Sequence, residues 1–235
     1  RRSGLRAGCA AAALAATPGL CASAAGAQAF NGTPTVAAGA VNFDRTTPGV
    51  ETITVLDDAI VNWAPVEAPD GSIDFLPAGN TATFQDSPGD GGFIILNRVL
   101  PTGNGIVQLN GNIISQLQTG AGNVRGGTVA FYSPTGILVG SAAAFDVGSL
   151  ILTAADPDPL SFQEFGAGSG ALNLATAPGS QARVQVAPGA TINSTAENSF
   201  LALVAPQVIM NGDVRVNDST AYVAAEAVEV TLNNG

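Results

Sequence analysis

The side chains that most often carry catalysis are scarce in this sequence. The chain of 235 residues contains no His, and all eight of its cationic side chains are Arg, so Lys is missing as well. Without His there is no Ser-His-Asp triad, no Cys-His pair and no imidazole metal site. Without Lys there is no P-loop lysine and no Schiff base. The net charge of -10 repels phosphate backbones, which argues against nucleic acid as a partner.

Two acidic segments and one glycine-rich stretch are the groups left for chemistry. The Asp pair at 57–58 and the Asp-Pro-Asp segment at 156–158 have the residue types for acid–base catalysis or Ca²⁺ binding. Neither lies in an EF-hand or a glycine-rich nonapeptide, so we interpret both as turn acids. The stretch 120–126 is similar to a dinucleotide-binding loop, but its spacing is one residue too long and a β-type run follows it. We interpret it as a surface turn and expect no catalytic residue, metal or cofactor.

Arg98 and Trp63 are further residues whose types indicate a specific role. Two interpretations of Arg98 stay open, namely an ion pair with an acidic neighbour and a contact for a partner. Trp63 is the only Trp, and we interpret it as the anchor of a cap rather than as a ligand platform.

Residues 1–29 have the pattern of a secretory signal peptide. Three Arg among the first six residues precede an Ala- and Leu-rich stretch that ends in small residues. The triplets 22–24 and 27–29 both fit the pattern of a cleavage site. The alternative is an Ala-rich helix of the mature fold, which the proline at position 18 disfavours. Both cysteines lie in this segment, so the mature protein is expected to be acidic, exported and free of thiols.

Beyond residue 30 the sequence consists of short β-type runs separated by Gly, Pro, Asn and Asp. Several runs alternate between apolar and polar residues, as strands with one buried face do. No window has the apolar spacing of an amphipathic helix, so we expect no helix there. The runs are 52–56, 93–96, 106–109, 128–132, 137–139, 150–152, 183–186, 200–204, 208–210, 214–216, 222–223 and 228–232.

The distance between these runs predicts how they are arranged. Val107, Val129 and Leu150 follow one another at 22 and 21 residues, and the run at 228–232 continues a similar repeat. A unit of this length with two or three short strands fits one coil of a solenoid. We therefore predict an all-β fold, namely a right-handed parallel β-helix with an N-terminal cap and short extra β elements. The cap and first coils are expected within residues 30–100, and the alternative fold is an antiparallel sandwich.

Several stretches also share a more specific pattern. Asn-Trp stands at 62–63, an apolar strand ends in Asn-Arg-Val at 93–99, and an apolar strand, a Ser-Pro-Thr-Gly-Ile turn and a second strand follow at 129–140. These stretches resemble the N-terminal secretion domain of two-partner-secretion exoproteins, the filamentous-haemagglutinin family. The family has Asn where this sequence has Ser133 and Thr135, whose hydroxyls can also cap a turn. Further matching stretches are 109–113, 144–150, 204–208 and 211–212.

The resemblance implies that residues 30–235 form a secretion-directing, haemagglutination-activity-like β-helix domain that is not an enzyme and stands at the front of a longer exoprotein. The implied partner is an outer-membrane two-partner-secretion transporter, whose periplasmic domains recognise the unfolded chain. The protein would be secreted or reach the cell surface, where the full-length protein contacts host or neighbouring cells. Candidate secretion-motif residues are Asn97, Arg98, Ser133, Pro134, Thr135, Gly136 and Ile137.

Two other functions stay open at this point. The domain could itself be an adhesive surface, which predicts that it binds cells or glycans without the rest of the protein. It could also be a β-helix enzyme that degrades polysaccharides with paired Asp, although the missing His and Lys and the lack of a clustered acidic motif disfavour this alternative.

Overall fold

The computed structural model of this chain describes residues 28–166, 168 and 170–231. Among these residues most of the secondary structure is β-strand, and most strands run parallel to their neighbours. The predicted signal peptide lies outside the described residues up to position 27, so its boundary stays a prediction. Within the described part of the chain, no helix has the length and apolar character needed to cross a membrane.

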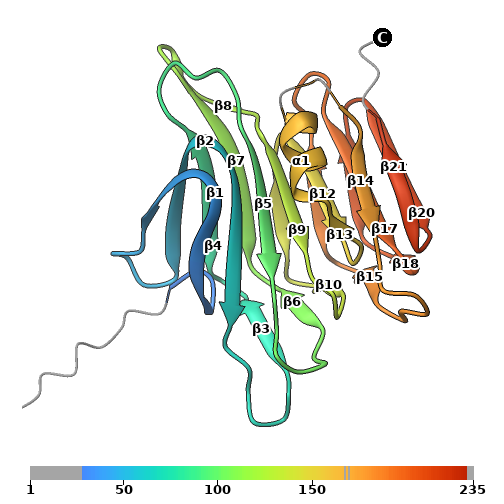
Figure 1. Cartoon of the computed structure of the whole chain (residues 1–235). Helices are drawn as coiled ribbons and strands as arrows, with labels where there is room; N and C mark the ends of the chain where they lie inside the picture. The colour runs from blue at the N-terminus through green and yellow to red at the C-terminus, as the bar shows by residue number, and fades with distance from the viewer. Residues whose placement is uncertain (1–27, 167, 169, 232–235) are drawn as a thin grey trace, which may run out of the picture.

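The parallel strands form three faces, which the chain visits in turn (Figure 1). Face A consists of the first half of β2 (Val50–Pro65), β4 (Thr81–Asp86), β7 (Asn112–Thr119), β11 (Ala144–Asp146), β16 (Thr191–Ser194) and β19 (Asp213–Val216). Face B consists of the second half of β2, β5 (Ile94–Val99), β9 (Thr128–Tyr132), β12 (Ser149–Thr153), β17 (Phe200–Ala205) and β20 (Ser219–Ala224). Face C consists of β3 (Ile73–Leu76), β6 (Val107–Leu109), β10 (Ile137–Val139), β15 (Arg183–Val186) and β18 (Gln207–Met210).

The interior of the coil is a continuous apolar column. Residues at equivalent positions of successive coils are paired in register between parallel strands. Their side chains therefore stack one above the next along the axis of the β-helix. On face B the fully buried side chains of such a row are Ile95, Val129, Leu150 and Leu201. Burying one aliphatic side chain of this size contributes about 1.5–3 kcal/mol before entropy is counted. The predicted all-β class and parallel β-helix are confirmed.

Of the two spacings used to predict the repeat, the one from Val129 to Leu150 spans one coil, whereas the one from Val107 to Val129 does not. Val129 pairs with Leu150, so the spacing of 21 residues corresponds to one coil. Val107 lies on face C and pairs with Ile137 instead. Its spacing to Val129 therefore compares two different faces, because periodicity alone does not say on which face a strand lies.

The N-terminal hairpin caps the first coil, as predicted. β1 (Gly32–Asp44) pairs antiparallel with β2, and its register shifts three times between Val36 and Val41. Such bulges protect the free edge of β1 from pairing with another chain. Trp63 is fully buried under this hairpin, with ring centroids 5.1 Å from Phe30 and 5.8 Å from Phe43. Its interpretation as a cap anchor is confirmed.

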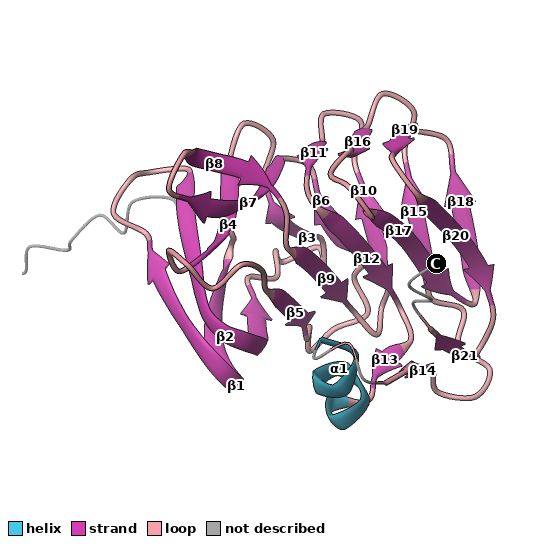
Figure 2. Cartoon of the chain, turned by 90° about the horizontal axis from the view of Figure 1, so that it is seen from above, coloured by secondary structure: helices cyan, strands magenta, loops and turns pink. Residues whose placement is uncertain are grey.

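A second layer covers the outer side of face B (Figure 2). We call it the outer module, and it consists of β13 (Asp156–Pro157), α1 (Pro159–Gly166), β14 (Leu172–Ala175) and β21 (Ala227–Val230). Apolar side chains of this module, such as Phe162 and Phe165, form a second core with the outward side chains of face B. The β12 and β17 strands of face B are therefore buried on both sides, and every residue of each is buried.

The outer module corrects two predictions from the sequence. The prediction of no helix beyond residue 30 is wrong: Asp158 caps α1 by accepting a hydrogen bond from the Ser161 amide at 2.8 Å. Eight residues are too few to show helical periodicity. The prediction that the run at 228–232 continues the repeat is also wrong, because β21 pairs antiparallel with β14. Val228 and Val230 pack against the second core rather than in the coil interior.

Candidate functional site

The ends of β5 and β9 bring the predicted motif residues to one corner of the coil. Asn97 and Arg98 are paired in register with Phe131 and Tyr132, the residues that precede Ser133. Because adjacent parallel strands end at the same corner, the turn at 133–136 lies beside the end of β5. The seven predicted residues therefore come together where face B turns into face C.

Asn97 is a polar residue inside the apolar column. Its side chain is 0 % exposed and points inward, between the inward-facing Ile95 and Val99. The Trp63 indole N–H donates a hydrogen bond to Asn97 Oδ1 at 3.0 Å, and Asn97 Nδ2 donates to the Ala130 carbonyl at 3.3 Å. One amide thus connects three successive coils, because Trp63, Asn97 and Ala130 belong to adjacent strands of face B.

Arg98 points outward from the same strand and holds the outer module. Its Nη2 donates to both carboxylate oxygens of Asp156 at 2.8 Å, and its guanidinium lies 5.5 Å from the centre of the Tyr132 ring. Burial raises the pKa of Tyr132 to about 12, with a smaller contribution in the same direction from Asp156, while Arg98 opposes both. Of the two interpretations of Arg98, the ion pair with an acidic neighbour is the one that the structure shows.

The predicted turn is closed by its own backbone and hydroxyl groups. The Gly136 amide donates to the Ser133 carbonyl at 3.1 Å, and the Ser133 and Thr135 hydroxyls are 3.1 Å apart. Gly136 has a φ of +97°, and a Cβ there would lie 2.5 Å from the Arg183 carbonyl oxygen of the next coil. Glycine is therefore required both by the backbone angle and by the close approach. Ser133 is buried, whereas Pro134 is exposed.

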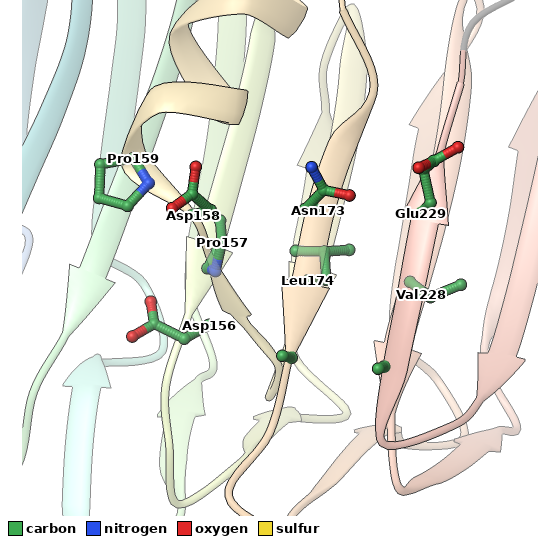
Figure 3. A pocket seen from close by; sticks show the side chains of 10 residues that line it. Asp156, Pro157, Asp158, Pro159, Asn173, Leu174, Val228 and Glu229 are labelled. Atoms are coloured by element: carbon green, nitrogen blue, oxygen red, sulfur yellow. The ribbon is translucent and has the colours of Figure 1, made fainter.

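The acidic segment at 156–158 borders an open groove of about 650 Å³ on the outer module (Figure 3). Asp156, Asp158, Asn173 and Glu229 line it from three neighbouring segments. Asp156 forms an ion pair with Arg98, and Asp158 caps the start of α1, so both carboxylates have structural roles. Among the described residues there is no group of three or more His, Cys, Asp or Glu side chains that could hold a metal ion.

The other two predicted segments also have structural roles. Asp58 Oδ1 accepts a hydrogen bond from the Ile94 amide at 2.9 Å, which connects the corner of β2 to the start of β5. The glycine-rich stretch 120–126 includes the turn between β7 and β8 (Gly122–Arg125), which pair antiparallel. The interpretation of this stretch as a surface turn is confirmed.

Sequence reasoning missed the partners that join these residues. Asn97 and Trp63 are far apart in sequence, and so are Arg98 and Asp156, so no local pattern pairs them. A local signal was available for α1, because Asp158 followed by Pro159 is a typical helix start. The motif residues therefore form contacts between neighbouring coils, and the Asn97, Ser133 and Ile137 side chains are buried.

Comparison with known proteins identifies the fold. No family model and no curated protein matches this chain. Among solved structures, the HMW1 secretion domain from Haemophilus influenzae is similar, with a TM-score of 0.62 and 16% sequence identity. The likeness covers 84% of this chain and 45% of that chain, so this chain spans less than half the length of that structure. The two chains share a fold despite their low identity.

Proposed function

We propose that this chain is the secretion-directing domain of a larger exported protein and that an outer-membrane transporter recognises it before it folds. The observation that carries the proposal is the fold that the chain shares with a domain named for secretion. This role needs no nucleophile, general base or metal, which agrees with a sequence that lacks His and Lys.

The burial of the motif supports recognition before folding. The Asn97, Ser133 and Ile137 side chains are fully buried in the coil, and Arg98 is occupied by Asp156. A partner that reads these side chains must therefore meet the chain while it is extended. In that state the apolar run at 93–99 can add a strand to an exposed sheet edge of the transporter's periplasmic domains, with side-chain pockets providing specificity.

Coil formation after export would favour outward movement. Each new coil pairs with the strands of the previous one, so stability increases as successive coils emerge. The acidic composition and the lack of Lys would limit unwanted association of the extended chain during transit. The free energy of folding would then bias transport without nucleotide hydrolysis.

A secretion assay with the transporter present tests this proposal. Deleting residues 90–150 removes the motif and is expected to abolish export; unchanged export would refute the proposal. Because the deletion also prevents folding, point variants separate recognition from stability. The Asn97→Ala, Ser133→Ala double variant changes the motif, whereas Ile192→Ala opens a cavity at a fully buried position of β16 on face A, outside the motif.

The readout for these variants is binding of the urea-unfolded chain to the purified periplasmic domains of the transporter. We expect the motif variant to lose binding and Ile192→Ala to keep it, although both lower the stability of the folded coil. Equal binding by the two variants would show that the buried motif is structural only.

A further inference from the structure

The first described residues form part of the core of the first coil. Ala29 and Phe30 are both 0 % exposed. The Phe30 ring stacks on Phe75 at a centroid distance of 4.8 Å and meets the edge of Trp63 at 5.1 Å. Phe30 therefore lies at the centre of the aromatic cluster under the cap, and its position depends on the backbone that leads into it.

Residues 28 and 29 are fixed by side chains of two other segments. Asn80 Nδ2 donates to the carbonyl oxygens of both Gln28 and Ala29 at 3.1 Å. Arg45 Nη1 donates to Gln28 Oε1 at 2.5 Å. A chain that lacked these two residues would leave the Asn80 amide and one Arg45 nitrogen without these partners and would open a cavity at Ala29.

The backbone nitrogen of Phe30 occupies a site suited to a neutral amide. It donates to Glu51 Oε2 at 3.3 Å, and the fully buried Glu51 also accepts from Arg45 Nε at 2.7 Å. If the chain began at Phe30, a charged α-ammonium group would take this buried position in place of the neutral amide and would have to be desolvated.

We propose that the leader is cleaved after Ala24, so that the mature chain begins at Ala25 and keeps residues 28–30 packed in the first coil. The sequence offers two small-residue sites, 22–24 and 27–29, and only the first leaves this packing intact. The inference rests on the proposed function, because it requires that the chain be exported behind a leader.

Two matched variants of the full precursor test the choice of site. Ala22→Tyr places a large residue in the first site and Ala27→Tyr places the same residue in the second, and both positions lie upstream of the described residues. The precursors are produced without the transporter, and the N-terminus of the periplasmic protein is read by intact mass and N-terminal sequencing. We expect wild type and Ala27→Tyr to begin at Ala25, and Ala22→Tyr to stay uncleaved or to shift to Phe30.

The outcomes separate this inference from the proposed function. A wild-type chain that begins at Phe30, or cleavage blocked by Ala27→Tyr alone, would overturn the inference and leave the proposed export intact. A wild-type precursor that is not cleaved at all would overturn both. If Ala22→Tyr yields a chain that begins at Phe30, we expect its melting temperature to be about 5–10 °C lower than that of wild type. An unchanged melting temperature would contradict the role of residues 28 and 29.

Discussion

Removing the hydrogen bond between Trp63 and Asn97 tests how the motif stabilises the folded coil. Asn97→Leu leaves the buried indole N–H without its acceptor, and Trp63→Phe leaves Asn97 Oδ1 without its donor. A buried polar group left unpaired costs about 1–3 kcal/mol, whereas removing both partners together is far less costly. Each single variant should therefore be destabilised more than its change in volume explains, and the double variant should cost less than their sum.

The expected magnitudes follow from the burial of both groups. Asn97→Leu should lower the free energy of unfolding by about 2–3 kcal/mol, because it also removes the bond to the Ala130 carbonyl. Trp63→Phe should cost about 2–4 kcal/mol, since it adds a cavity under the cap. The coupling between the two sites should then be about 1–2 kcal/mol, which lies within the range measured for residues in contact.

Urea unfolding followed by circular dichroism measures these values, because Trp63 is the only Trp and fluorescence is lost with it. The dependence on urea should have the same slope in all variants, so that midpoints report stability. Gln108→Leu on the partly exposed outer side of face C is the matched control and should change stability by less than about 0.5 kcal/mol. If the losses of the two single variants add to that of the double variant within about 0.5 kcal/mol, the hydrogen bond does not join the first two coils in the way proposed.

Three further predictions concern other parts of the structure. Gly136→Ala should lower the melting temperature by about 5–10 °C, whereas Gly179→Ala, where a Cβ meets nothing within 4 Å, should cost much less. Phe162→Ala leaves a cavity in the second core and should lower the free energy of unfolding, measured in urea, by about 3–5 kcal/mol. Leu160→Ala changes a side chain that is 71% exposed and should leave this free energy nearly unchanged. Because the pKa of Tyr132 is raised to about 12, the stability it contributes is fully present below pH 10 and is lost as the pH rises through about 12. Tyr132→Phe should remove that loss in urea midpoints measured over this range. Equal effects within either matched pair, or identical pH profiles, would contradict the corresponding assignment.

The strands could be predicted because their signal is local. Alternation such as that of Val184 and Val186 marks one buried face, and it requires only neighbouring residues. The continuous apolar run of β17 was visible too, although the sequence does not say that a second layer causes it. The missing His and Lys likewise limit the possible chemistry before any fold is known.

The pairing of coils was decided only by the tertiary structure. The partner of a parallel strand lies a whole coil away, and insertions such as the outer module change that length from one coil to the next. A fixed spacing therefore cannot separate a true pair from two strands on different faces, as the Val107 and Val129 positions show.

The candidate site shows the same division. Residue types and the family resemblance indicated Asn97, Arg98 and Ser133, whereas their partners and their burial depend on the register between coils. Alternation is a property of a short segment and composition needs no fold, so the amino-acid sequence was enough to predict strands and to exclude catalysis that requires His or Lys. The contacts of the motif arise from hydrogen-bonded ladders between distant segments, and only the folded coil brings those segments together.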